Sequence, residues 1–101
     1  MIARIWHGRT AATHLDAYSE LLHRLAIPDY QKTKGFRGLN FLRRIEGGEA
    51  HFNLITYWED LESIRNFAGT DLEKAKYYPE DKDFLLEFEE RVVHYEVFAS
   101  V

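Results

Sequence analysis

The chemistry open to this chain is limited by the residue types that it lacks. It contains no cysteine, and its five histidines show no paired spacing such as H-E-x-x-H, so the sequence predicts neither a thiolate nucleophile nor a metal site. Glycine-rich phosphate loops and the G-x-S-x-G elbow are also missing, so no motif supports a flavin, a nicotinamide or another bound cofactor. What remains is a high aromatic content, 15%, and isolated polar side chains that can exchange protons.

We therefore expect any site to be an aromatic slot that is joined by a few hydrogen-bonding groups. The candidate substrate-binding rings are Trp6, Trp58, Phe67, Tyr77 and Tyr78. The candidate catalytic side chains are His7, Asn53, Arg65 and His94.

Several of these candidates also have a structural interpretation. Trp58 stands where a strand gives way to a helix and suits a packing anchor, and Phe67 lies on an apolar helix stripe. His94, inside a strand, suits a hydrogen-bonded structural residue, and Arg65 suits a surface ion pair. The Tyr77-Tyr78-Pro79 run is suited to ending a helix and covering a pocket.

Length and charge narrow the function classes. At 101 residues the chain is expected to be one domain, residues 1–101, with an adequate but thin core. The net charge of -4 argues against a non-specific nucleic-acid binder. The first residues lack the apolar run of a signal peptide or membrane span, so we expect a cytoplasmic protein with no membrane partner.

The elements of the first half follow from periodicity and caps. Ile2–Arg9 predicts a strand, and Thr13 with Asp16 predicts a capping box that opens a helix. The apolar stripe of that helix comprises Leu15, Tyr18, Leu22 and Leu25. Pro28 is expected to break or kink the helix, and Gly35 to end it.

A hairpin and a second helix are predicted next. The strands are 37–46 and 50–58, and Gly47-Gly48 between them would supply the positive φ angles of a tight turn. Asp60 is expected to cap a helix that Gly69 ends.

The last third is less regular. Thr70 with Glu73 predicts a third, short helix that ends before Pro79. Residues 80–91 are read as a turn of helix or a loop, and 92–100 as the last strand.

The order strand, helix, strand, strand, helix pair, strand predicts an α+β, ferredoxin-like βαββαβ fold with a four-stranded antiparallel sheet. The strands are apolar on both sides, because Phe52 and Leu54 point one way while Ile55 and Tyr57 point the other. We therefore expect a homodimer that forms through the free sheet face. The alternative is a monomer with an unusually apolar exposed face.

Two stretches carry a family resemblance. Leu54-Ile55-Thr56-Tyr57-Trp58-Glu59-Asp60 with residues 64–69, and Ala75-Lys76-Tyr77-Tyr78-Pro79-Glu80-Asp81 leading to 92–97, resemble the antibiotic biosynthesis monooxygenase (ABM) superfamily. The resemblance extends over essentially the whole chain. It implies a dimeric α+β barrel with a pocket between sheet and helices in each subunit, but its motifs specify a fold and not a reaction.

The resemblance leads to one function hypothesis and one rival from another class. Members of the superfamily include oxygenases that need no cofactor and oxidise polyketide phenols with dioxygen; for this chain we expect such a monooxygenase, acting on a small aromatic or polyketide-type substrate. The rival is a non-catalytic dimer, a stress-response protein or a binder of small hydrophobic molecules. An enzyme should direct at least two polar groups, such as His7 with Asn53, into a ring-sized cavity, whereas the rival should fill that space.

Two other functions are disfavoured. The haem-degrading branch uses an Asn, a Trp and a His, and the matching positions here hold about His7, Phe67 and Tyr77, which all differ. An RNA-recognition domain shares the topology, but Gly38 replaces the central aromatic of its signature and the acidic charge opposes phosphate binding.

Overall fold

The computed structural model describes all residues, 1–101. Its strands are β1 (Ile2–Ala11), β2 (Phe36–Glu46), β3 (Glu49–Trp58) and β4 (Val93–Glu96). Between β1 and β2 lie the short turn η1 (Ala12–His14), α1 (Leu15–Leu21), the π-helical turn η2 (Leu22–Ala26) and α2 (Ile27–Gln31). Between β3 and β4 lie α3 (Leu61–Ala68) and the 3-10 turn η3 (Pro79–Asp83).

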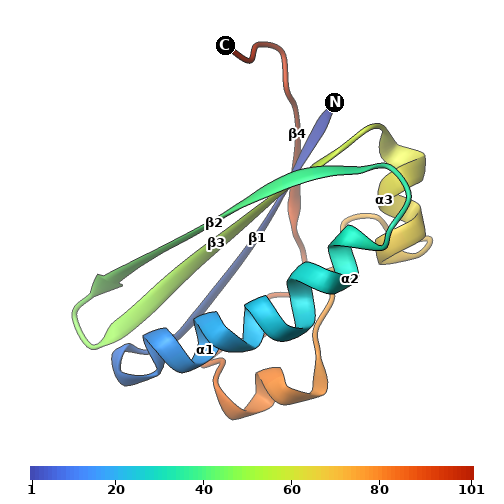
Figure 1. Cartoon of the computed structure of the whole chain (residues 1–101). Helices are drawn as coiled ribbons and strands as arrows, with labels where there is room; N and C mark the ends of the chain where they lie inside the picture. Colours follow the sequence, from blue (N-terminus) through green and yellow to red (C-terminus); the bar gives the residue numbers. More distant parts are fainter.

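The four strands form one antiparallel sheet in the order β2-β3-β1-β4. The helices cover one face of this sheet and leave the other face bare (Figure 1). The predicted α+β class with a four-stranded antiparallel sheet is thereby confirmed. The dimeric barrel remains a prediction.

The last strand is shorter than predicted. β4 pairs only with the first residues of β1, from Ile5↔Val93 to Ile2↔Glu96. Beyond Glu96 the backbone N–H of Val97 still reaches the carbonyl of Met1, and then β1 offers no further partner. Residues 97–101 therefore run past the sheet, and Phe98 is 91% exposed.

The first helix continues through Pro28 instead of breaking. In η2 the N–H of Ile27 donates to the carbonyl of Leu22, five residues back, so the turn is wider than an α turn. The ring of Pro28 crowds the preceding turn, and a widened turn gives it room. The predicted Thr13 capping box is wrong, because the N-terminus of this helical run has no side-chain cap.

The caps predicted further on are confirmed at α3. The N–H of Ser63 donates to Oδ1 of Asp60 over 2.9 Å, and Gly69 ends the helix at φ 88° with its N–H bonded to Arg65. In the β2–β3 turn only Gly47, at φ 59°, adopts a positive φ angle.

The third helix predicted from Thr70 and Glu73 is absent. Residues 70–78 are irregular, and their backbone pairs with the later segment instead: Ala75 donates to Glu90 over 2.9 Å, and Val92 donates to Glu73 over 2.8 Å. Tertiary pairing thus overrides the local capping signal. We call residues 70–92 the covering segment, because they close the space between the sheet and the helices on the side away from β2.

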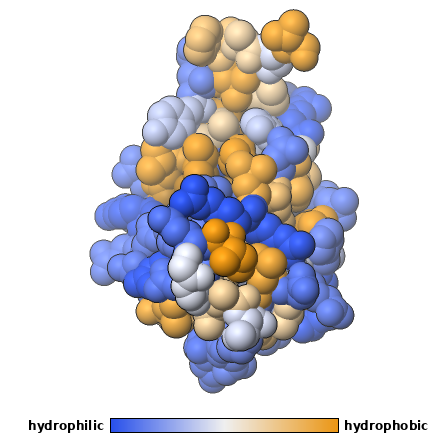
Figure 2. All heavy atoms as spheres, turned by 90° about the vertical axis from the view of Figure 1, so that its left-hand side faces the viewer, coloured by the Kyte–Doolittle hydropathy of each residue, from blue (hydrophilic) through white to orange (hydrophobic).

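The uncovered face of the sheet divides into two halves. On β1, β3 and β4 its apolar half comprises Ile5, Ile55, Tyr57, Val93 and Tyr95, and its polar half comprises His7, Arg9, Glu49, His51 and Asn53. β2 is mixed, because it places Asn40 beside Ile55 and Leu42 beside Asn53. Figure 2 shows apolar side chains gathered below the C-terminal segment, and hydrophilic and apolar ones mixed further down the view. The prediction of an apolar free face therefore holds for only half of it.

None of the helices has the length and hydropathy that a membrane-spanning helix requires.

Candidate functional site

The space between sheet and helices is almost completely filled at its centre. Large side chains that are less than 2% exposed, among them Trp58, Tyr18 and Phe52, occupy it. The cavity that remains has a volume of about 10 Å³ and includes Trp6, Leu22 and Tyr30 in its lining. Such a volume holds at most one water molecule, so no ring can enter without movement of side chains.

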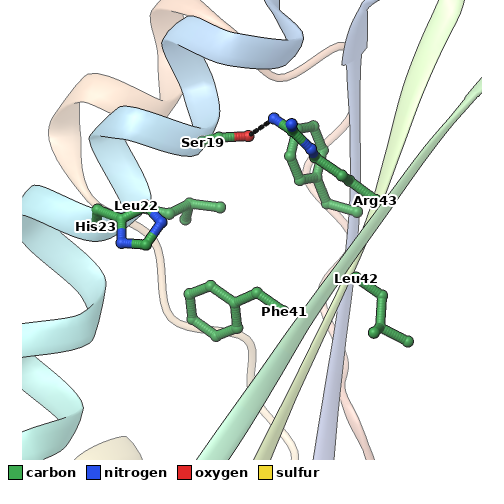
Figure 3. A pocket seen from close by; sticks show the side chains of 7 residues that line it. Ser19, Leu22, His23, Phe41, Leu42 and Arg43 are labelled. Carbon is green, nitrogen blue, oxygen red and sulfur yellow. Dashed lines mark hydrogen bonds between the residues drawn. The ribbon is translucent and has the colours of Figure 1, made fainter.

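A larger groove opens at the edge of the same layer, between the α1–η2 helix and β2. Its volume is about 310 Å³. Leu22, Phe41 and Phe52 supply apolar surface, and Ser19, His23 and Arg43 supply polar groups (Figure 3). This volume lies at the lower end of the usual range for small-ligand pockets, roughly 300 to 1,000 Å³.

The polar rim of the groove is held by hydrogen bonds. Arg43 Nη1 donates to Ser19 Oγ over 2.8 Å (Figure 3). The same nitrogen lies 3.2 Å from Asp16 Oδ1. The guanidinium is therefore tethered beside the helix while it stays accessible to solvent. On the other side, Leu22 lines both the groove and the small interior cavity.

The interior also holds a buried charge. Arg4 is 3% exposed, yet no carboxylate pairs with it. Its guanidinium donates to the carbonyls of Leu72 and Lys74 and lies 3.1 Å from Nε2 of His94. Burial lowers the pKa of Arg4, and burial followed by the charge of Arg4 lowers the pKa of His94. His94 is thus neutral and accepts from the guanidinium.

Two further interior groups distinguish this core from a purely apolar one. The Nε1 of Trp6 is buried and has no hydrogen-bond partner; its ring lies across Gly8, where a Cβ atom would come within 2.3 Å of it. The buried carboxyl of Asp81 accepts from the hydroxyl of Tyr18 over 2.9 Å and from the N–H of Tyr78 over 2.7 Å. Burial is the main cause that raises the pKa of Asp81.

The four candidate catalytic residues lie in three separate places. His7 and Asn53 face each other across β1 and β3, but on the uncovered face of the sheet. Arg65 is exposed on α3 with Glu62 3.5 Å away, and His94 lies beside Arg4. The expected convergence of His7 and Asn53 on a pocket between sheet and helices does not occur, because strand alternation directs both outward.

The candidate rings lie mostly inside the core. Trp58 is fully buried, and its Nε1 donates to Thr56 Oγ1 over 2.8 Å, which supports the packing interpretation. Phe67 stacks on Tyr30 with 4.6 Å between ring centroids. Tyr77 and Tyr78 belong to the covering segment, and the hydroxyl of Tyr78 donates to Asp29 over 2.6 Å.

The positions matched to the haem-degrading residues are also placed by the structure. His7 points outward, and its neighbour Trp6 is the residue that faces the interior. The hydroxyl of Tyr77 donates to the carbonyl of Glu89, and burial, followed by nearby carboxylates, raises the pKa of Tyr77 to about 12. A phenol in this state is poorly suited to bind iron as a phenolate.

Sequence reasoning missed Arg4, Ser19, His23 and Arg43. A signal existed for Arg4, because it shares the inward alternation of Trp6 in an otherwise apolar strand. No comparable signal marks the groove residues. They come together only through the packing of the α1–η2 helix against β2.

The chain is similar to known proteins in structure only. No family model matches it, and no curated protein matches its sequence. A protein from Nitrosomonas europaea described as a "putative antibiotic biosynthesis monooxygenase" is similar at 16% identity with a TM-score of 0.69, over 98% of this chain and all of that one. One of the same description from Bacillus cereus has 15% identity and a TM-score of 0.64, over 99% and 95% of the two chains.

A haem degrader has the same fold. MhuD from Mycobacterium tuberculosis, solved with two haems in its active site, has 21% identity and a TM-score of 0.57, over 100% of this chain and 99% of that one. At these identities the similarity establishes the fold and leaves the reaction open. The resemblance of the sequence to the ABM superfamily is confirmed at that level.

Proposed function

We propose that this protein is a monooxygenase of the ABM type that oxidises a small aromatic or polyketide-type substrate with dioxygen and without a bound cofactor. The observation that carries the proposal is the groove of about 310 Å³ between the α1–η2 helix and β2. It combines apolar walls with several polar groups, which is what a planar phenol requires. The similarity in fold to proteins described as monooxygenases supports it.

The groove suits a substrate that reacts as an anion. The ring of a phenol or quinol would lie against Phe41 and Phe52, with its oxygen toward the guanidinium of Arg43, whose positive charge favours the ionised form. With an anthrone, the reacting ring carbon carries two hydrogens, and one of them leaves as a proton when the anion forms. The anion then reacts with dioxygen: one oxygen atom becomes a carbonyl on that carbon, and the other leaves as water with the remaining hydrogen and the released proton. Rotation of Leu22 would admit a larger ring toward Trp6.

Oxygen uptake with a panel of anthrones and quinols tests this function. Arg43→Gln should lower kcat/KM about tenfold or more, because it removes the charge that stabilises the anion. Leu22→Trp should raise KM by filling the groove. Arg37→Gln, on the same strand but paired with Glu59 outside the groove, is the matched control and should behave as the parent chain. No turnover above background with the parent chain would refute the proposal.

A second candidate function rests on the filled interior. A non-catalytic dimer, used in binding small hydrophobic molecules or in a stress response, is expected to fill the space that an enzyme keeps open, and the centre of this molecule is filled.

For both functions we propose that two copies pair through the apolar half of the uncovered face, where Val93 and Tyr95 are more than half exposed.

Light scattering at micromolar concentration tests the pairing. A mass near twice 12.0 kDa is expected for the parent chain, and Tyr95→Glu should shift it toward a single chain, because the change places a charge in an apolar contact. Glu96→Gln, on the opposite side of the same strand, is the control. A parent chain that scatters as a monomer would exclude the pairing.

A further inference from the structure

Two histidines meet on the polar half of the uncovered face. His7 on β1 and His51 on β3 are diagonal neighbours across the register, and His7 Nε2 lies 3.5 Å from His51 Nδ1. Their side chains are 36% and 25% exposed and line a surface groove of about 350 Å³. A small ligand can therefore reach both inner nitrogens.

The outer nitrogen of each ring faces a carboxylate. His7 Nδ1 is bonded to Glu89, and His51 Nε2 lies 3.5 Å from Glu49 Oε1. A carboxylate acceptor keeps the imidazole proton on the nitrogen that it faces. In these tautomers both inner nitrogens carry lone pairs, and a metal ion between the rings would bind both of them.

The separation of the inner nitrogens suits a metal ion. Two imidazoles that bind one Zn²⁺ at about 2.0 to 2.1 Å and near the tetrahedral angle place their nitrogens about 3.3 to 3.4 Å apart. The carboxylate behind each ring is the arrangement that orients metal-binding histidines in proteins. No group of three or more His, Asp or Glu side chains converges here, so water or the amide of Asn53 would complete the coordination.

We propose that His7 and His51 bind a divalent first-row transition ion of the Zn²⁺ or Cu²⁺ type, held in orientation by Glu89 and Glu49. The sequence offered no hint, because the two ligands are 44 residues apart and only the β1–β3 register unites them. The two histidines lie on the opposite face of the sheet from Phe41 and Phe52 of the proposed substrate groove, although Leu42 and Arg43 line both hollows. Neighbouring cations do not oppose it, since Arg9 pairs with Glu49 and Arg44 with Glu46.

Titration calorimetry of the untagged chain with Zn²⁺, above the pH at which histidine is protonated, tests the site. We expect one ion per chain. His7→Asn and His51→Asn should each weaken binding at least tenfold, and Glu89→Gln should weaken it about 10- to 100-fold through the loss of the orienting carboxylate. Glu87→Gln is the matched control: Glu87 lies on the same segment, 3.6 Å from Arg9, and should leave the affinity unchanged.

Copper resonance gives a second readout that a change in folding does not mimic. Cu²⁺ bound to the parent chain should show coupling to two imidazole nitrogens, and each histidine variant should show one fewer while retaining its circular dichroism. No uptake of Zn²⁺ at millimolar concentration would overturn the proposal. Unchanged affinity in both histidine variants would overturn it as well.

Discussion

The two faces of the sheet use the same strands for opposite purposes. On the covered face, β1 and β3 bury Trp6, Phe52 and Trp58 together with one charge, Arg4, whose hydrogen bonds anchor the covering segment. On the uncovered face, the same strands present apolar residues at one end and two histidines with their carboxylates at the other. Alternation therefore assigns residues to faces reliably, whereas the chemistry on a face depends on which neighbour each residue meets.

The largest expected difference between the faces concerns two adjacent residues of β3. Trp58→Ala should lower the free energy of unfolding by about 3 to 5 kcal/mol, because Trp58 is completely buried. Tyr57→Ala, on the uncovered face, should cost less than about 1 kcal/mol in dilute solution. Urea denaturation measures both. Equal losses would mean that the uncovered face is also buried, as in a tight dimer, and the loss for Tyr57→Ala would then depend on protein concentration.

The buried guanidinium gives the next largest effect. Arg4→Met should destabilise the chain by about 2 to 3 kcal/mol, because the carbonyls of Leu72 and Lys74 lose their donors. Hydrogen exchange should show faster opening of residues 70–78 while β3 stays protected. Arg65→Met, which removes an exposed arginine of α3, is the control. A uniform rise in exchange over the whole chain would mean that Arg4 does not specifically anchor the covering segment.

A smaller effect separates two capping signals that look alike in sequence. Asp60→Ala should cost about 1 kcal/mol, because its carboxylate accepts from the N–H of Ser63. Thr13→Ala should cost almost nothing, since no side chain caps the first helix. Thermal unfolding compares the two variants. A loss for Thr13→Ala as large as that for Asp60→Ala would contradict the fold as described.

The smallest effect is a dependence on pH that belongs to the covered face. The pKa of His94 is lowered in the folded chain by burial and by Arg4, so below about pH 6.5 the unfolded chain takes up a proton that the folded chain does not. The contribution of His94 to the free energy of unfolding is fully present above that pH, and it is lost as the pH falls toward the lowered pKa. His94→Gln should flatten the change in unfolding midpoint between about pH 7 and 5. An unchanged slope would show that other groups cause it.

Much of the fold was predictable because its signals are local. Strand alternation, the Gly47 turn and the Asp60 cap each need only a few neighbouring residues, and all three appear where expected. The helix predicted at Thr70 failed for the opposite reason: its backbone groups bond to residues 90–92, which are far away in sequence.

The candidate site was predicted less well than the fold. His7 and Asn53 were expected to converge on a cavity between sheet and helices, but strand alternation directs both to the uncovered face. The groove that carries the proposed function needs Leu22 and Phe41 from two elements whose contact no sequence pattern encodes. Sites that are built from long-range packing are therefore the part of this molecule that the sequence alone does not predict.

The wide turn η2 has a consequence for how this helix can vary. An α-helix rotates by about 100° per residue, and a π turn accommodates one extra residue without shifting the helix axis. The inward residues on either side of it, Tyr18 and Tyr30, are thus out of phase by one position. Deleting a single residue from 22–26 would keep both tyrosines inward, but regular winding would bring the Pro28 ring back against the preceding turn, so the extra residue and Pro28 depend on each other.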